Sequence, residues 1–451
     1  MSEKVKTTAV EKGSGKQSRR EFLGTSAAVG GGMAAILASG KAPLYAQERE
    51  LRMLVWSHFV PASDDELQRQ FDEFGKQNKV KVRMDRVAHL QLPAVLAGEV
   101  QGQKGHDIVN VSNSNPHLYS DHLVDLGDIY DKIGANGGGW TADTMGKGRQ
   151  GQQVALPWYF ISFPLVYRKD LLEKVGEGVP DTWEDVHRVG KKLKAMGHPL
   201  GIQLGHSADA NWINRGILWS MGGKLVEDDS KTVAVNSKET LETFKFVRAL
   251  YKDCMEEEVL AWDDRNNNVC MISGKCSMIL NPISAYRAAV RTNGLIPGTQ
   301  DPIAPQISHV IPPAGPNGRH MAASFVGVGV WKFAREVDLA KEFLSYHFEK
   351  ENQQKLLVAS KGYNQPVLGD FTNHEIFTSE DVYKFAVDIG KYTHSLGWPG
   401  VPTAAAQTVY DQYLLPDALA ECATDRLSAE DAVAKLEKQM KRIYKRFNRK
   451  Y

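Results

Sequence analysis

At 451 residues, the chain is too long for one ordinary hydrophobic core and has the length of two or three domains. Its 42% hydrophobic, 24% charged and 9% aromatic content is typical of a soluble globular protein, and excludes a disordered chain, a collagen-like repeat and a membrane bundle. The 55 Lys and Arg residues balance 54 Asp and Glu residues, so the charge gives no reason to expect a nucleic-acid partner.

The first 46 residues predict an export signal. Residues 18–24, SRREFLG, look like a twin-arginine signal, in which paired arginines precede an apolar stretch. The stretch 22–38 is short and only mildly apolar, which favours a cleaved segment over a permanent membrane span. Residues 44–46 are an imperfect cleavage site, and an uncleaved anchor is the alternative. In both cases we expect the twin-arginine translocase to export the folded body to the periplasm.

The first part of the body predicts strands that alternate with helices. Residues 51–56 read as a strand, and 64–78 as a helix with apolar residues at helical spacing. A second strand follows at 80–84, a short helix at 92–98 and a third strand at 106–111. This alternation indicates βαβ units and a mainly parallel sheet, which gives an α/β first lobe.

The same pattern recurs further along the chain. We expect strands at 165–167, 201–204, 277–280 and 325–331, and helices from 169, 180, 240–251 and 338–348. From 379 onward the sequence reads as mostly helical, and it ends in a basic amphipathic stretch at 429–446. Asp181 or Thr182 is the expected cap of the helix near 180, and Ser428 that of the last helix. The Pro- and Gly-rich segment 292–318 predicts a crossing between lobes.

The sequence contains no recognisable catalytic or metal-binding motif. It lacks a P-loop, H-E-x-x-H, G-x-S-x-G and CxxC, so we expect no enzyme activity, no metal and no cofactor. The four cysteines, Cys254, Cys270, Cys276 and Cys422, lack zinc spacing. Export permits a disulfide between Cys270 and Cys276, but we favour buried thiols.

Five segments in a fixed order carry a resemblance to a known family. They are 156–172 (with LPW and LVYRKDLL), 180–185 (PDTWED), 222–237 (with GGKL and VNS), 273–281 (SGKCSMILN) and 325–344 (with FVGVGV and AKEFL). This order resembles the extracellular solute-binding proteins of ABC importers, in the carbohydrate-type family that includes maltodextrin-binding protein. Arg168 stands where the family usually has Asn, a difference of little functional weight.

The resemblance implies an α/β, two-lobed periplasmic-binding-protein fold of class II, with a hinge and a ligand cleft between the lobes. The N-terminal lobe would comprise 47–158 with about 312–350, and the C-terminal lobe 159–311 with about 351–451. The implied function is to bind a small solute, a sugar by preference, and to deliver it to an ABC permease. We expect a monomer and no nucleic-acid partner.

Sugars present hydroxyl groups around an apolar ring face, so their sites combine flat aromatic rings with hydrogen-bonding groups. Ligands of α/β folds bind beyond the carboxyl ends of strands. Some residues lie near such strand ends or near the crossings, and others lie in loops that border the cleft in the family. These rules give ten candidates: Trp56, His58, Asp107, Asn113, Trp158, Tyr159, Trp212, Asn281, Tyr286 and Trp398. The crossing residues Trp158 and Tyr159 are the most attractive of them, because a hinge faces the cleft.

Three other solutes and one other function stay open. A polyol would use the same groups as a sugar, a glycerol phosphate would need a cation such as Arg215 or Arg287, and a polyamine would need carboxylates among aromatic rings. A secreted carbohydrate-active enzyme would need two positioned acids. Asp263 and Asp264 are adjacent in sequence and therefore point different ways, and a solvated charge cluster is the interpretation we favour for them.

Overall fold

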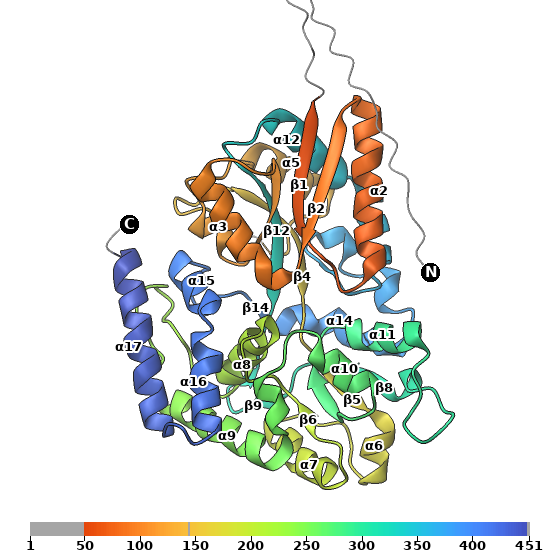
Figure 1. Cartoon of the computed structure of the whole chain (residues 1–451), viewed down its shortest axis with the longest axis vertical. Coiled ribbons are helices and arrows are strands. Elements are labelled where there is room, and N and C mark those ends of the chain that lie inside the picture. Colours follow the sequence, from red (N-terminus) through yellow and green to blue (C-terminus); the bar gives the residue numbers. More distant parts are fainter. Residues whose placement is uncertain (1–48, 143–144, 449–451) are drawn as a thin grey trace, which may run out of the picture. The chain divides into compact units, whose positions relative to one another are not determined.

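The computed structural model describes residues 49–142 and 145–448. The export signal and cleavage site that we expect within residues 1–46 lie outside this part of the chain. Among the described residues, no helix combines the length and the apolar character that a membrane crossing requires. The body from Glu50 onward contains two large β-sheets, each with its own helices, and two short two-stranded sheets (Figure 1).

The first sheet has six strands in the order β13-β4-β12-β3-β1-β2. Strands β1 (Glu50–Trp56), β2 (Lys81–Val87) and β3 (Ile108–Ser112) are parallel to one another. Strand β12 (Ser324–Val330) runs antiparallel between β3 and β4 (Ala155–Ile161), and β13 (Gln365–Pro366) pairs with the outer edge of β4. Every residue of β3, β4 and β12 is buried, as expected for strands covered on both faces.

Helices cover this sheet and complete the first lobe. They are α2 (Pro61–Asn78), α3 (Leu92–Gly102), α4 (Asn115–Leu118), α5 (Gly127–Asn136), α12 (Val337–His347) and α13 (Lys350–Ala359). Phe71 and Phe74 of α2 pack edge-on against Phe343 of α12, with ring centroids 4.8 and 5.4 Å apart. The side chain of Gln70 donates a hydrogen bond to the backbone carbonyl of Asn352, which attaches α13 to α2.

Two segments belong to a different lobe from the one that we predicted from the sequence. We assigned residues 351 onward to the second lobe, yet α13 and β13 lie on the first sheet. We also ended the first segment at 158, whereas β4 remains in the first sheet as far as Ile161. The sequence analysis predicted no element at 350–359, and a local pattern does not say which sheet such a segment packs against, which explains the difference.

The second sheet has four strands in the order β6-β7-β5-β8. They are β6 (Leu200–Gly201), β7 (Met278–Leu280), β5 (Leu165–Arg168) and β8 (Ile307–Val310). The segment 292–318, which we expected to cross between lobes, contains β8 and the short hairpin of β9 (Ala314–Gly315) and β10 (Gly318–Arg319). The crossing into the first sheet follows at 320–323, directly before β12.

The helices of the second lobe surround this sheet. They are α6 (Lys169–Lys174), α7 (Trp183–Ala195), α8 (Ala208–Ser220), α9 (Lys238–Cys254), α10 (Asn266–Ile272), α11 (Ser284–Thr292), α14 (Lys384–Ile389), α15 (Ala404–Asp411), α16 (Leu414–Ala423) and α17 (Ala429–Asn448). Thr182 and Ser428 cap α7 and α17 as predicted, since their hydroxyls accept from the backbone N–H groups of Asp185 and Asp431. Every residue of α8 is buried, which makes it the central helix of this lobe.

Short elements connect the two sheets. Strand β11 (Met321–Ala322) pairs with β14 (Thr393–His394), just before the chain enters β12. Turns of 3₁₀ helix lie at His89–Gln91, Glu257–Leu260, Ala304–Gln306, Gly369–Phe371, Glu375–Phe377, Asp381–Tyr383 and Gly390–Tyr392.

The cysteines differ from our expectation in one respect. Cys270 and Cys276 form a disulfide, which joins the end of α10 to the segment before β7. The expectation of buried thiols is therefore wrong for this pair and confirmed for Cys254 and Cys422, which are free and buried.

Candidate functional site

An aromatic cluster lies at the carboxyl edge of the first sheet. The indole Nε1 of Trp56, the last residue of β1, donates a 2.9 Å hydrogen bond to the hydroxyl of Tyr159 on β4. The ring of His58 lies 5.0 Å from that of Trp56 and 4.7 Å from that of Tyr363. These four side chains are at most 9% exposed. The cluster unites three segments of the first lobe that are far apart in sequence.

His58 is a neutral member of this cluster. Burial lowers its pKa to about 4, and hydrogen bonds to Asn364 and Val60 only partly oppose that effect. The backbone N–H of Val60 donates to Nδ1 at 2.9 Å, so the ring proton belongs on Nε2, which then donates to Asn364 Oδ1 at 2.9 Å. The imidazole is therefore fixed in orientation and uncharged at neutral pH.

A buried polar network lies at the corresponding edge of the second lobe. Asp209, in the first turn of α8, accepts a 2.7 Å hydrogen bond from the amide of Asn267 on α10. The same amide donates to Asn281 Oδ1 at 2.9 Å, and Asn281 follows β7. The carboxylate of Asp264 accepts from the backbone N–H of Asp209 at 3.1 Å. The amino end of α8 thus lies among two carboxylates and two amides.

Both carboxyl groups have a raised pKa. For Asp209 the main cause is burial, and the negative charge of Asp264 adds to it. For Asp264 burial again dominates, while His89 and backbone N–H groups act in the opposite direction. Hydrogen bonds from Asn267 and Gln203 offset only part of the shift at Asp209. A hydrogen-bond donor that enters the site would therefore stabilise the charged form of either acid.

The two groups of residues act on each other across the lobes. Burial raises the pKa of Tyr363, and the charges of Asp209 and Asp264 raise it further. His89, just after β2, has a pKa lowered by burial, and Asp264 opposes this shift. These electrostatic effects link the rings of Tyr363 and His89 in the first lobe to the acids of the second.

The lobes also meet beside this site. The backbone N–H of Ser114, just after β3, donates a 2.9 Å hydrogen bond to Gln407 Oε1 on α15. The backbone N–H of Ala404 donates to His117 Nδ1 at 3.0 Å. The lobes are therefore in contact between the segment that follows β3 and α15.

Four of the ten sequence candidates lie in these two groups of residues. Trp56, His58 and Tyr159 lie in the aromatic cluster, and Asn281 lies in the polar network. Trp158 points elsewhere: its indole packs edge-on against His347 at 5.2 Å, within the first lobe. The register between β4 and β12 shifts at Val326/Gly327, which leaves Trp158 opposite no residue of β12 and turns it toward α12.

Four further candidates serve the fold or the surface. The carboxylate of Asp107 accepts from the backbone N–H groups of Arg52, Arg335 and Glu336, at the opposite edge of the sheet from Trp56. Asn113 Oδ1 accepts from the N–H of Phe325 and so fixes β12. Trp212 is 1% exposed and packs on Tyr410 at 4.7 Å inside the second lobe, while the hydroxyl of Tyr286 donates to Glu380 on the surface.

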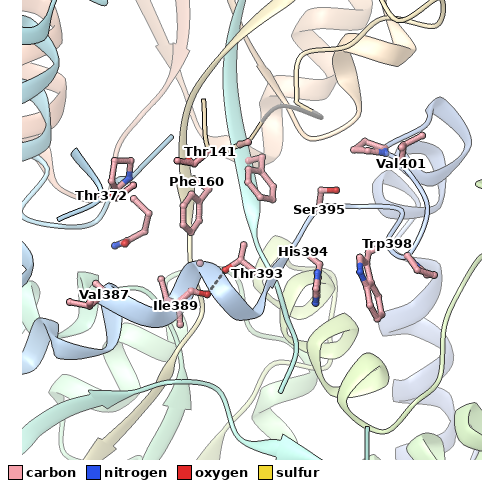
Figure 2. A pocket seen from close by; sticks show the side chains of 18 of the residues that line it. Thr141, Phe160, Thr372, Val387, Ile389, Thr393, His394, Ser395, Trp398 and Val401 are labelled. Atoms are coloured by element: carbon pink, nitrogen blue, oxygen red, sulfur yellow. Dashed lines mark hydrogen bonds between the residues drawn. The ribbon is translucent and has the colours of Figure 1, made fainter. Parts of the chain in front are cut away.

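The last candidate, Trp398, lines a different cavity, which we call the rear cavity. It has a volume of about 480 Å³ and lies between Phe160 and Phe325 of the first sheet and the segment 386–402. Figure 2 shows Phe160 and Thr141 above the segment that contains Thr393, His394 and Trp398. Because successive residues of a strand point to opposite faces, Phe160 and Tyr159 face opposite sides of β4.

Sequence reasoning missed several residues of the site. Asp264 was interpreted as part of a solvated charge cluster, but its side chain is 9% exposed and lies inside the network. Asp209 and His89 were not among the sequence candidates, although His89 follows β2 and the rule for strand ends would have found it. Tyr363 and Asn364 follow α13, and no sequence signal links them to β1.

Comparisons with known proteins agree with this architecture. The pattern of the family described as bacterial extracellular solute-binding protein matches residues 61–354. A probable ABC transporter-binding protein of Deinococcus radiodurans is 22% identical over 65% of this chain and 69% of its own. The diacetylchitobiose binding protein DasA of Streptomyces coelicolor is 23% identical over 44% of this chain and 48% of its own.

A solved structure supports the same fold. The maltose-bound MalE3 of T. maritima superposes with a TM-score of 0.74 at 20% identity, over 87% of this chain and 99% of that protein. The two-lobed α/β fold expected from the sequence is thereby confirmed. This chain belongs to the bacterial extracellular solute-binding protein family, whose pattern spans more than half of it.

Proposed function

We propose that the solute is a carbohydrate and that it binds at the front site, which comprises Trp56, His58, His89, Tyr159 and Tyr363 of the first lobe and Asp209, Asp264 and Asn267 of the second. The observation that carries the proposal is a cluster of rings at the carboxyl edge of the first sheet, together with buried acids and amides of the second lobe whose charges act on Tyr363 and His89. A sugar needs both, since its ring faces pack on aromatic groups and its hydroxyls hydrogen-bond to carboxylates and amides.

Charge argues against a phosphorylated solute. Among the described residues of the front site, the formal charges are those of two acids, and Lys and Arg are absent. Arg215 lies inside the second lobe, where its guanidinium donates to both oxygens of Asn211. Arg287 pairs with Glu380 on the surface. A phosphate would therefore meet carboxylates instead of cations.

A polyamine is the second candidate, because two acids lie among aromatic rings here. Ammonium groups would lower the pKa of both carboxyl groups more than uncharged sugar hydroxyls would. The two solutes are therefore distinguished by the protons exchanged on binding. A polyamine should release more protons than a sugar.

We propose that the chain reaches the periplasm through the twin-arginine translocase and there acts as a monomer that delivers its solute to the permease. The paired Arg19 and Arg20 support the export route. Changing both arginines to lysine should retain the precursor in the cytoplasm. Equal periplasmic amounts of the variant and the parent would contradict this route.

The first experiment is thermal unfolding of residues 47–451 with sugars, polyols, glycerol phosphates and polyamines. A ligand that binds only the native state adds about 2.7 kcal/mol of stability at a hundredfold excess over its dissociation constant. A selective shift with one sugar class is the expected result. If only polyamines or glycerol phosphates raise the melting temperature, the protein is still a solute receptor, but its solute is not a carbohydrate.

A further inference from the structure

The rear cavity is built from both lobes but is separate from the front site. Phe160 and Phe325 reach it from the first sheet, and their rings lie 5.6 Å apart as a cross-strand pair. Tyr159, the neighbour of Phe160, does not line the rear cavity and contacts Trp56 on the other face of β4. The rear cavity and the front site have no residue in common.

The second lobe contributes a fixed aromatic pair. The rings of His394 and Trp398 stack with centroids 4.3 Å apart. Behind them, Trp219 lies 5.2 Å and His320 4.9 Å from the Trp398 ring. His320 also hydrogen-bonds to His394 at 2.8 Å. The indole of Trp398 is thus supported from behind and does not need a ligand to hold its position.

The part of the rear cavity's lining that the structure describes is uncharged. No Asp, Glu, Lys or Arg is among its described lining residues. Burial lowers the pKa of His394 to about 4, and the neighbouring His320 acts in the same direction, so this imidazole is neutral at neutral pH. The polar groups present are hydroxyls and one amide, among them Thr141, Ser395 and Gln365. A charged molecule would lose its hydration there without gaining a counter-ion.

We propose that the rear cavity is a second binding site, and that it takes an uncharged, flat, aromatic molecule of about two fused rings with a hydroxyl or carbonyl group. Its volume of about 480 Å³ falls within the range of small-molecule pockets, roughly 300–1,000 Å³. The four rings supply the apolar contact, and the hydroxyls supply one or two directed hydrogen bonds. This chemistry differs from that of the front site, which presents acids.

The test is saturation-transfer NMR on residues 47–451 with 2-naphthol, compared with 2-naphthoate, which has the same rings and a negative charge. We expect saturable transfer with 2-naphthol and little with 2-naphthoate. Two variants, Ser395→Trp and Thr141→Trp, each place an indole in the cavity and should abolish the 2-naphthol signal. Ser379→Trp adds the same side chain at an exposed position outside the cavity and should leave the signal unchanged.

Thermal unfolding of each variant checks that it is folded. Equal 2-naphthol signals in Ser395→Trp, Thr141→Trp and Ser379→Trp would overturn the proposal, as would equal binding of naphthoate and naphthol. Because the two sites have no residue in common, either result is independent of whether the front site binds a sugar.

Discussion

Trp56 and Tyr159 are joined by a 2.9 Å hydrogen bond between the indole N–H and the phenol oxygen, although 102 residues separate them in the chain. The bond connects the end of β1 to β4, next to the crossing between the lobes. It orients both rings toward the front site and satisfies a buried donor that would otherwise cost about 1–3 kcal/mol. Tyr159 rather than its neighbour Trp158 therefore connects the crossing to the solute site.

Adjacent substitutions on β4 should differ in their effect on solute affinity. Tyr159→Phe removes the hydroxyl and leaves the Trp56 N–H unpaired, so it should lower the melting temperature and also lower solute affinity by about tenfold or more, because both rings lose their fixed orientation. Trp158→Phe shrinks a side chain packed on His347, so it should lower the melting temperature while affinity changes less than twofold. Calorimetric titration and thermal unfolding measure the two effects. A larger affinity loss in Trp158→Phe than in Tyr159→Phe would contradict this assignment.

Asp209→Asn should weaken binding without weakening the fold. The pKa of Asp209 is raised because its charged form is buried beside Asp264, so a neutral amide of the same shape relieves repulsion. The loss of a charged acceptor should lower solute affinity by roughly 10–100-fold, while stability stays equal or rises. Asp263→Asn is the matched control, since Asp263 is half-buried and pairs with Arg265. Equal affinity losses in both variants would remove Asp209 from the site.

The fold was largely predictable from the sequence because it follows local patterns. The mostly apolar run at 51–56 and the helical spacing of Leu67, Phe71 and Phe74 identify β1 and α2 without any tertiary information. The site was less predictable because it depends on partners distant in sequence. Asn364 contacts His58 across 306 residues, and the burial of Asp264 depends on α8 and on the first lobe. The orientation of Trp158 depends on a register shift that no residue pattern on β4 reveals.

The protein should lose stability in mild acid, in part through His58. Its pKa is about 4 in the folded chain and about 6.5 when unfolded, so the unfolded chain binds more protons between these values. The stabilisation is complete above pH 6.5 and is lost as the pH falls toward 4, by a contribution on the order of 3 kcal/mol. His58→Gln should show a smaller loss of stability over this range. Urea unfolding at pH 7.5 and pH 4.5 measures the difference, and parallel losses in both proteins would contradict the assignment.

Reduction of the Cys270–Cys276 disulfide should weaken both the fold and solute binding. The bond closes a short loop between α10, which provides Asn267, and β7, after which Asn281 lies, so it limits how far the two halves of the polar network can separate. A loop of this length is worth roughly 2 kcal/mol in the chain-entropy model. We expect a reductant to lower the melting temperature and the solute affinity of the parent chain, and to leave the double variant Cys270→Ser, Cys276→Ser unaffected. The free thiols Cys254 and Cys422 are present in both proteins, so they cancel in the comparison. If the fully reduced parent, verified by thiol labelling, keeps its affinity, then the network depends on the packing of α8 and not on the disulfide.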